Sequence, residues 1–357
     1  MSKISAIGVA VPSLRLAVEE LAEHLAVDPN KYKIGLGCVA QSLCGPDDTP
    51  TQLGVRAAQF ALEQWGGDVN RIGMLAVGTE TALDMSRPLG AWMAEALQLP
   101  ESVRSYEVKH ACYAGTLALR QAYEWQRSGA SRGKAALVIC ADEALYAPGH
   151  PGEPTQGAAA VAMILDETGF AEIGLHSYAF QRPAFDFWRP VGEAYPQVDG
   201  PLSIRCYQDA FSSCLQQWAE DDQAAFALND VDAWAMHAPF PKMVLKGFIA
   251  GQQTIGVDEA TAQQRYDEQV LPGLAWNRQV GNCYTASTWL SFACTAARSD
   301  EAKNIALFSY GSGCGAELLL LQQTAPVAPT LHASVEAQFA AQTVLSAQDY
   351  ATLRTHK

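Results

Sequence analysis

The chain has 357 residues, of which 49% are hydrophobic and 17% are charged, a balance typical of a folded globular protein rather than a disordered one. Its formal net charge is −14 without any cluster of Lys and Arg, which argues against a binding surface for nucleic acid or an anionic membrane. No apolar run approaches the length of a membrane span, and the first residues lack a signal-peptide pattern, so we expect a cytoplasmic protein.

The nine cysteines are odd in number and lack the paired CxxC spacing of a zinc site. Most of them lie in apolar segments, where a cysteine behaves as a small buried hydrophobic residue. We therefore expect neither a disulfide framework nor a metal site.

Helical patterns alternate along the chain with apolar segments rich in β-branched residues. The predicted helices are 51–65, 87–97, 113–128, 204–219, 242–250 and 285–297. The predicted strands are 72–80, 134–144, 157–167, 232–239, 304–313 and 315–323. This alternation indicates an α/β fold. The Gly/Pro-rich segments 146–157 and 189–201 are predicted to be long loops of the kind that shape binding sites.

A weak internal repeat becomes visible when the two halves of the chain are compared. In each half a strand, a helix, a second strand and a Gly-Ala strand follow one another in the same order. The four segments are marked by Glu80, Cys112, Asp142 and Ile164 in the first half, and by His237, Asn282, Ser309 and Leu320 in the second. Two such units packed about a pseudo-twofold axis would bring Glu80, Cys112, His237 and Asn282 toward one central place.

Cys112 lies where the segment EVKHACYAGTLALRQAYEW (107–125) changes from mixed polarity to an apolar helical pattern. A thiol at a helix N-terminus faces unpaired backbone N–H groups, which stabilise the thiolate and lower the pKa of the thiol. Cys112 is therefore either a nucleophile or one more small buried residue.

Glu80 and His237 each follow a predicted strand, and each alone has a structural explanation, as a loop residue or a buried histidine. Together with Cys112 they form a thiolate nucleophile, a carboxylate base and an imidazole acid. These three groups suffice to make and break bonds to thioesters. The combination thus favours thioester chemistry.

Several segments resemble, in order from Lys31 to Leu320, the signatures of the 3-hydroxy-3-methylglutaryl-CoA synthase family of the thiolase superfamily. The segments are VGTETALDMSRP, EVKHACYAGT, GEPTQGAAAVAMI, FDFWRPVGEAYPQVDGPLS, HAPFPKM, VGNCYTAS and FSYGSG. The resemblance implies a thiolase-like fold with a duplicated, five-layered αβαβα core, usually as a homodimer. It divides the chain into an N-terminal half at 1–170, a C-terminal half at 171–330 and a short tail at 331–357.

The resemblance also implies a reaction, the condensation of acetyl-CoA with acetoacetyl-CoA and hydrolysis to 3-hydroxy-3-methylglutaryl-CoA, a step of isoprenoid biosynthesis through mevalonate. It implies that Cys112 carries the acetyl group, that Glu80 is the general acid or base and that His237 addresses the acetoacetyl thioester. No metal or cofactor is implied beyond the CoA thioester substrates.

Further residues match positions that bind substrate in this family. By resemblance, Tyr146, Asn282 and Tyr284 line the acyl pocket, and the backbone N–H groups of Cys112 and Ser312 stabilise the enolate. Lys242 and Lys246 lie four residues apart on a predicted helix, hence on one face, and match lysines that bind CoA phosphates. They could otherwise be a solvated helix face.

The sequence departs from the family pattern at His110, at the Ala114-Gly115 pair, at Pro241 and at Leu245, and its C-terminal region is short. Two alternatives therefore stay open. The first is a synthase of the same family that installs β-branches in polyketides and takes its acyl groups from acyl carrier proteins, although Lys242 favours free CoA. The second is a non-catalytic scaffold in an acyltransferase assembly, against which the intact Cys112, Glu80 and His237 argue. A ketoacyl synthase is disfavoured by Glu80.

Overall fold

A computed structural model describes residues 2–298, 301 and 303–355 of the chain. The first half of the chain builds one side of the core. Its strands are β1 (Lys3–Ala10), β4 (Ile72–Gly78), β5 (Arg104–Val108), β6 (Ala135–Ala144) and β7 (Gly157–Asp166). They lie in the order β1-β7-β6-β4-β5. β4 is parallel to β5 and β6, whereas β7 is antiparallel to its neighbours β6 and β1.

The second half repeats this arrangement. Its strands are β8 (Ala171–Ala184), β11 (Ala233–Met236), β12 (Lys303–Gly311) and β13 (Gly313–Gln323), in the order β11-β12-β13-β8. β11 is parallel to β12, and β13 is antiparallel to β12 and β8, as β7 is to β6 and β1. The halves join where β1 pairs with β8 through Lys3 and Ile4. The internal repeat seen in the sequence is therefore a repeat of topology.

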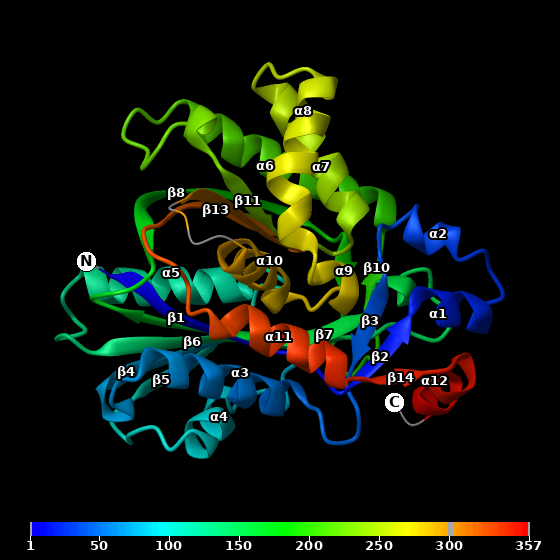
Figure 1. Cartoon of the computed structure of the whole chain (residues 1–357), viewed down its shortest axis with the longest axis horizontal. Helices are drawn as coiled ribbons and strands as arrows, with labels where there is room; N and C mark the ends of the chain where they lie inside the picture. The colour runs from blue at the N-terminus through cyan, green and yellow to red at the C-terminus, as the bar shows by residue number, and fades with distance from the viewer. Residues whose placement is uncertain (1, 299–300, 302, 356–357) are drawn as a thin grey trace.

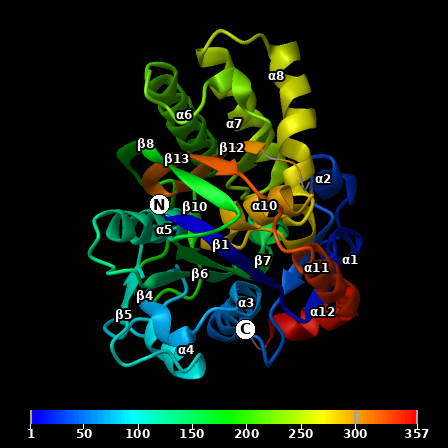
Figure 2. The same ribbon diagram turned by 60° about the vertical axis from the view of Figure 1, so that its left-hand side comes forward.

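Helices separate and cover the two halves of this nine-stranded sheet, called here the first sheet (β1 and β4 to β7) and the second sheet (β8 and β11 to β13). Figures 1 and 2 place α5 (Ala114–Arg127) and α10 (Thr285–Ala297) between the sheets. The first sheet is covered by α3 (Pro50–Trp65) and α4 (Gly90–Ala96), and the second by α6 (Gly200–Ala219) and α7 (Pro241–Thr254). The predicted thiolase-like core with five αβαβα layers is confirmed.

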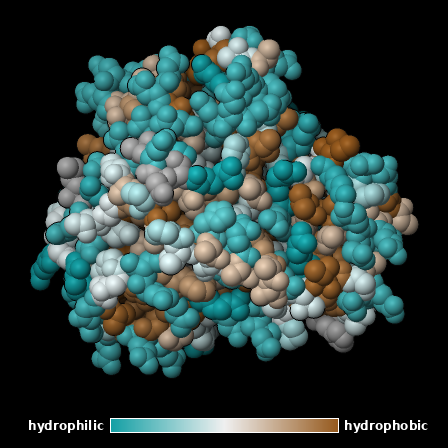
Figure 3. All heavy atoms as spheres, in the orientation of Figure 1, coloured by the Kyte–Doolittle hydropathy of each residue, from teal (hydrophilic) through white to brown (hydrophobic). Residues whose placement is uncertain are grey.

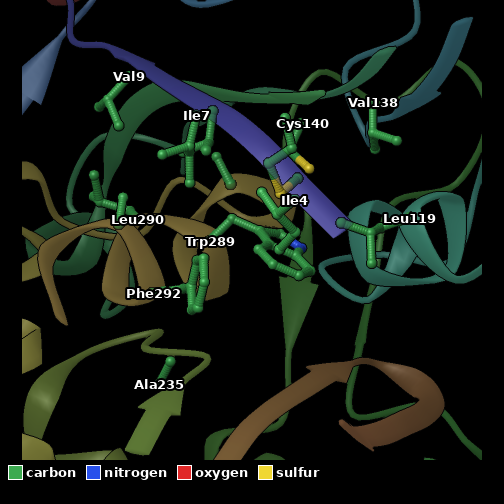
Figure 4. Close-up of a cluster of buried hydrophobic side chains, with 14 of the residues drawn as sticks. Ile4, Ile7, Val9, Leu119, Val138, Cys140, Ala235, Trp289, Leu290 and Phe292 are labelled. Carbon is green, nitrogen blue, oxygen red and sulfur yellow. The ribbon is translucent and has the colours of Figure 1, made fainter. Parts of the chain in front are cut away.

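Helix α10 lies in the middle layer of the core. Every residue of α10 from Thr285 to Ala296 is buried, and its polar side chains are only the small hydroxyls of Ser and Thr. Figure 4 shows Trp289, Leu290 and Phe292 of α10 near Ile4, Ile7 and Val9 of β1, with Leu119 of α5 beside them. This packing fixes the start of α10 against the first sheet.

The remaining elements are peripheral. They are β2 (Leu14–Ala17), α1 (Val18–His24), α2 (Asn30–Lys33), β3 (Ala40–Leu43), β9 (Phe187–Trp188), β10 (Gln197–Val198), α8 (Glu259–Arg265), α9 (Asn277–Val280), α11 (Thr330–Ala341), β14 (Thr343–Leu345) and α12 (Ala347–Arg354). Strand β14 extends β2 and β3 to a small sheet, so the last described residues pack on the N-terminal half. Figure 3 shows a mainly hydrophilic face over α6, α7 and α8. Within the described residues no helix is both long and apolar enough to cross a membrane.

The predicted elements agree closely with these bounds. All six predicted strands and all six predicted helices are present, and α5 begins one residue after its predicted start. The sequence patterns missed β1, β5 and β8. β8 contains a Gly and a Pro and alternates between buried and exposed residues only over part of its length, which weakens its strand signal.

Candidate active site

Cys112 lies in a tight turn between β5 and α5. Ala111 adopts a positive φ of 44°, and Tyr113 donates its backbone N–H to the carbonyl of His110. The turn directs the thiol of Cys112 toward Glu80, and the distance from Sγ to Oε1 of Glu80 is 3.1 Å. Cys112 is only 7% exposed.

Burial, and then the carboxylate of Glu80, raise the pKa of Cys112 above its ordinary value. The expectation that the helix N-terminus lowers this pKa is therefore wrong for the resting site. The physical reason is that loss of solvent and a nearby negative charge both oppose the thiolate, and together they outweigh the helix end. Cys112 is therefore a thiol that donates a hydrogen bond to Glu80.

Glu80 follows the end of β4 and is held through its main chain. Its N–H donates to Oδ1 of Asp142 at 2.8 Å, and its carbonyl accepts from Arg189 at 2.7 Å. Burial, reinforced by the charge of Asp142, raises the pKa of Glu80 to about 8, against the opposing effects of Cys112 and Arg189. A carboxyl group with such a pKa can both take and return a proton near neutral pH.

Asp142 is the buried residue that fixes this arrangement. Its Oδ1 accepts from Thr79, Thr81 and the N–H of Glu80, and its Oδ2 accepts from the hydroxyl and N–H of Thr285. These bonds tie the end of β4 to the start of α10. The sequence reasoning placed Asp142 at a strand end but gave it no role in the site.

His237 enters the site from the end of β11 and is 1% exposed. Its N–H donates to the carbonyl of Phe308, and its own carbonyl accepts from Tyr207 at 2.8 Å. Burial lowers the pKa of His237 to about 3, so the imidazole is neutral at physiological pH. Its Nδ1 is buried and has no hydrogen-bond partner among the described residues.

One cavity brings most of the predicted residues together. It is lined by Cys112, Tyr146, Phe187, Ser203, His237, Pro239, Asn282, Tyr284, Tyr310 and Ser312. Residues from both halves of the chain therefore meet at Cys112, as the internal repeat predicted. Glu80, which contacts Cys112, lines another cavity together with residues 187–194.

The two predicted lysines lie outside this cavity. Lys242 is half-buried at the start of α7, where its N–H donates to the carbonyl of Leu36. Lys246 is exposed one turn later, and its carbonyl accepts from Gln208. Both follow His237 closely in the chain, so they lie on the helix that leads away from the site.

Asp186 is a further residue that the sequence reasoning did not single out. It is fully buried and accepts hydrogen bonds from the hydroxyls of Tyr310 and Ser312 and from the N–H of Gly313. It thereby holds the 310–313 segment against the site. The sequence signal that could have identified Asp186 is a single charged residue among the aromatic residues of the FDFWRP segment.

His110, which departs from the family pattern, packs beside the turn that holds Cys112 and does not line the cavity. Its ring contacts the ring of Tyr113 edge-on, with centroids 5.3 Å apart. It also covers Gly315, where an added Cβ would come within 2.5 Å of the imidazole. A glycine at 315 is what makes room for the histidine.

Comparison with known families accounts for nearly the whole chain. The model described as Hydroxymethylglutaryl-coenzyme A synthase N terminal matches residues 2–169, and the corresponding C terminal model matches residues 173–251 and 255–353. The chain belongs to the hydroxymethylglutaryl-CoA synthase family. The resemblance read from the sequence motifs is confirmed, and with it an acyl-transferring enzyme that forms carbon–carbon bonds.

Individual members of the family are similar over most of their length. The hydroxymethylglutaryl-CoA synthase of Enterococcus faecalis is 34% identical over 323 residues, which cover 88% of this chain and 81% of the relative. The solved structure of MvaS in complex with 3-hydroxy-3-methylglutaryl coenzyme A is 35% identical with a TM-score of 0.92, covering 99% of this chain and 91% of that chain. The curacin biosynthetic HMG synthase in complex with its acetyl donor-ACP is 26% identical, also with a TM-score of 0.92, covering 99% and 88%.

Proposed function

We propose that this protein is a hydroxymethylglutaryl-CoA synthase that condenses acetyl-CoA with acetoacetyl-CoA. The observation that carries the proposal is the 3.1 Å contact between Cys112 and Glu80 at one wall of a cavity whose other wall is His237. The membership of the HMG-CoA synthase family and the likeness to MvaS, whose solved structure contains the HMG-CoA product, support it.

The first step is transfer of the acetyl group to Cys112. The thiol loses its proton as sulfur attacks the thioester carbonyl, and the departing CoA sulfur gains one, so acetyl-Cys112 and free CoA result. The buried, neutral His237 and the amide of Asn282 lie on the same cavity and provide polar groups for the thioester oxygens.

The second step makes the carbon–carbon bond. Glu80, whose pKa is raised to about 8, removes a proton from the acetyl methyl group once the sulfur is acylated. The resulting enolate attacks the ketone of acetoacetyl-CoA, and the alkoxide that forms takes up a proton to become the 3-hydroxy group, which balances the proton that Glu80 removed. Water then cleaves the thioester to Cys112, which restores the thiol and releases 3-hydroxy-3-methylglutaryl-CoA.

Mass spectrometry of the products tests this function. The wild-type protein with acetyl-CoA and acetoacetyl-CoA should yield one HMG-CoA and one CoA per turnover. Cys112→Ser should yield none and should take up no acetyl group from labelled acetyl-CoA. A wild-type protein that binds both substrates but forms neither product nor acetyl-enzyme would support the scaffold alternative.

A second candidate is β-branch formation on carrier-bound polyketide chains. The likeness to the curacin HMG synthase bound to its donor-ACP and to PksG from Bacillus subtilis favours it. The two candidates share Cys112, Glu80 and His237 and differ only in the carrier of the acyl groups. Lys242 and Lys246 support free CoA, because cations on α7, the helix that follows His237, would bind its phosphates.

We also propose a cytoplasmic homodimer in which residues 1–170 and 171–330 form the paired halves of each subunit. β5 is an edge strand that pairs with β4 alone among the described residues, and the nearby loop exposes Leu83 and Met85. An open edge with apolar neighbours favours pairing with a second copy. Among the described residues all nine cysteines are buried and none forms a disulfide, which fits a reducing compartment. Light scattering at micromolar concentration tests the dimer.

A further inference from the structure

The C-terminal helix α12 packs beneath the loop that supplies Tyr146 to the reaction cavity. The helix starts at a capping box formed by Ser346 and Asp349. Tyr350 and Arg354 lie one turn apart on its inner face and are both buried. They enter a polar cluster with Glu153 and Gln156 of the 146–157 loop, and both of these side chains are fully buried.

This cluster fixes both backbone polar groups of Tyr146. The N–H of Tyr146 donates to Oε1 of Gln156 at 2.7 Å, and the amide of Gln156 in turn donates to the hydroxyl of Tyr350 at 3.1 Å. The carbonyl of Tyr146 accepts directly from Nη2 of Arg354. A residue 208 positions away in the sequence thus holds the peptide groups that set the direction of the Tyr146 side chain.

Arg354 also links this loop to a second wall of the site. Its Nε lies 3.7 Å from Oε1 of Glu153, which also accepts from Tyr350 at 2.6 Å. Its guanidinium lies over the ring of Tyr195, 5.7 Å from the centroid, in the loop that also carries Phe187. One cation therefore contacts both loops that wall the reaction cavity.

The ring of Tyr146 is correspondingly confined. It stacks on His150 with the ring planes 7° apart, and it meets Phe187 edge-on with centroids 6.4 Å apart. It covers Gly152, where a Cβ would come within 2.6 Å of it. Burial raises the pKa of Tyr146, so its hydroxyl stays protonated as a possible donor beside Cys112.

We infer that α12 is a positioning element of the active site and that Arg354 is its positioning residue, acting through the main chain of Tyr146. The inference rests on the proposed function only where it assigns Tyr146 to the acyl pocket. Arg354 touches no reacting atom. It fixes where the ring of Tyr146 stands relative to Cys112, and a shift of about 1 Å there is enough to slow catalysis about 100-fold.

The test separates positioning from charge balance, because Arg354 also neutralises the buried Glu153. Arg354→Lys keeps the positive charge but loses the planar fork that reaches both the Tyr146 carbonyl and Glu153. The double variant Arg354→Met with Glu153→Gln removes both charges and so leaves no unpaired ion. Gln348→Ala, on the exposed face of α12, is the matched control.

Two measurements are made on each variant. One is kcat and KM for the condensation, per folded molecule as judged by near-UV circular dichroism. The other is the rate at which iodoacetamide alkylates Cys112, which needs no substrate. Both Arg354 variants should lose about 10- to 100-fold in kcat with a much smaller change in KM, and should alter the alkylation rate. Gln348→Ala should match the wild type in both.

A third comparison shows whether Arg354 acts through Tyr146. In a Tyr146→Phe background, Arg354→Lys should cost much less than in the wild type, because the group it positions is already gone. Wild-type values in Arg354→Lys, or full recovery in the double variant with Glu153→Gln, would overturn the inference and leave Arg354 as the counterion of Glu153. If the wild type makes no HMG-CoA, the proposed function fails, whereas the alkylation rates still decide the role of α12.

Discussion

Sγ of Cys112 and Oε1 of Glu80 lie 3.1 Å apart, and each group changes the proton affinity of the other. The carboxylate raises the pKa of the thiol, and the thiol hydrogen bond lowers the pKa of the carboxyl group, which burial and Asp142 nevertheless raise to about 8. Acylation of the sulfur removes this hydrogen bond. If Glu80 is the base of the condensation, its proton affinity is therefore highest in the acylated intermediate, where that base would act.

Glu80→Gln should separate the two half-reactions. Loss of the carboxylate removes two of the influences that raise the pKa of Cys112, so loading of the acetyl group should persist. The condensation needs a base and should fall by about 100-fold or more. Labelled acetyl-CoA measures the first step, and product formation from the isolated acetyl-enzyme measures the second.

The control for this variant is Glu63→Gln, which removes an exposed carboxylate from α3, outside both cavities, and should leave both steps unchanged. A Glu80→Gln protein that loses loading and condensation in equal measure would show that Glu80 supports the structure of the site instead of serving as its base.

The condensation step should depend on pH through Glu80. Only the carboxylate removes the methyl proton, so the single-turnover rate from acetyl-enzyme should rise about tenfold per pH unit below the pKa and level off above about 8. Because acylation removes the thiol hydrogen bond, the midpoint should lie at 8 or above. Stopped-flow or quenched-flow measurements between pH 6 and 9.5 give the profile, and a midpoint near 4.5 would contradict it.

Asp142→Asn should destabilise the fold as well as the site. The amide group of Asn would place N–H donors opposite the N–H and hydroxyl of Thr285, which now donate to the carboxylate of Asp142. At least one buried donor would then be unpaired, which should lower the free energy of unfolding by about 1–3 kcal/mol. Loss of the Asp142 charge should also lower the midpoint of the pH profile. Urea unfolding measures the stability. Asp222→Asn, at an exposed position, should have little effect, and equal stability of the two variants would refute the role given to Asp142.

Alkylation should single out Cys112. It lines the reaction cavity, so iodoacetamide should abolish activity at one label per chain, and acetyl-CoA should protect the enzyme. Since its pKa is raised, the alkylation rate should keep rising up to pH 9 without a plateau. Peptide mass spectrometry locates the label. Even labelling of several cysteines with activity retained would rule out Cys112 as the acyl acceptor.

The sequence predicted the parts of the site whose signals are local. Cys112 precedes an apolar helical pattern, and Glu80 and His237 follow apolar strand patterns. The hydrophobic periodicity therefore predicted that each of the three lies at the end of a helix or strand. The repeat of strand and helix order then predicted that they meet. Ser312 was placed beside them only by the family resemblance of the FSYGSG segment.

Long-range hydrogen bonds left no such signal. Asp142 resembles any charged residue at a strand end until Thr285, from the other half, is seen to donate to it. Arg354 lies in a helix with little amphipathic character near the end of the chain, and nothing in the local pattern relates it to Tyr146. The pKa of Cys112 was mispredicted for a related reason, because a helix end is visible in the sequence whereas burial beside a carboxylate is not.

The choice between CoA and carrier protein depends on Lys242 and Lys246. If they bind CoA phosphates at an exposed pocket mouth, replacing either by Ala should raise KM for acetyl-CoA about 10-fold, or ~1.4 kcal/mol, and leave kcat nearly intact, because binding is lost equally in the ground and transition states. Added salt should weaken acetyl-CoA binding more in the wild type than in the double Ala variant, since the attraction is screened.

Lys3→Ala, at the start of β1 in an ion pair with Glu172, is the control for loss of a surface cation. If both lysine variants use acetyl-CoA normally while an acetylated carrier protein is a far better donor for every form, the free-CoA proposal is wrong and the β-branching synthase takes its place.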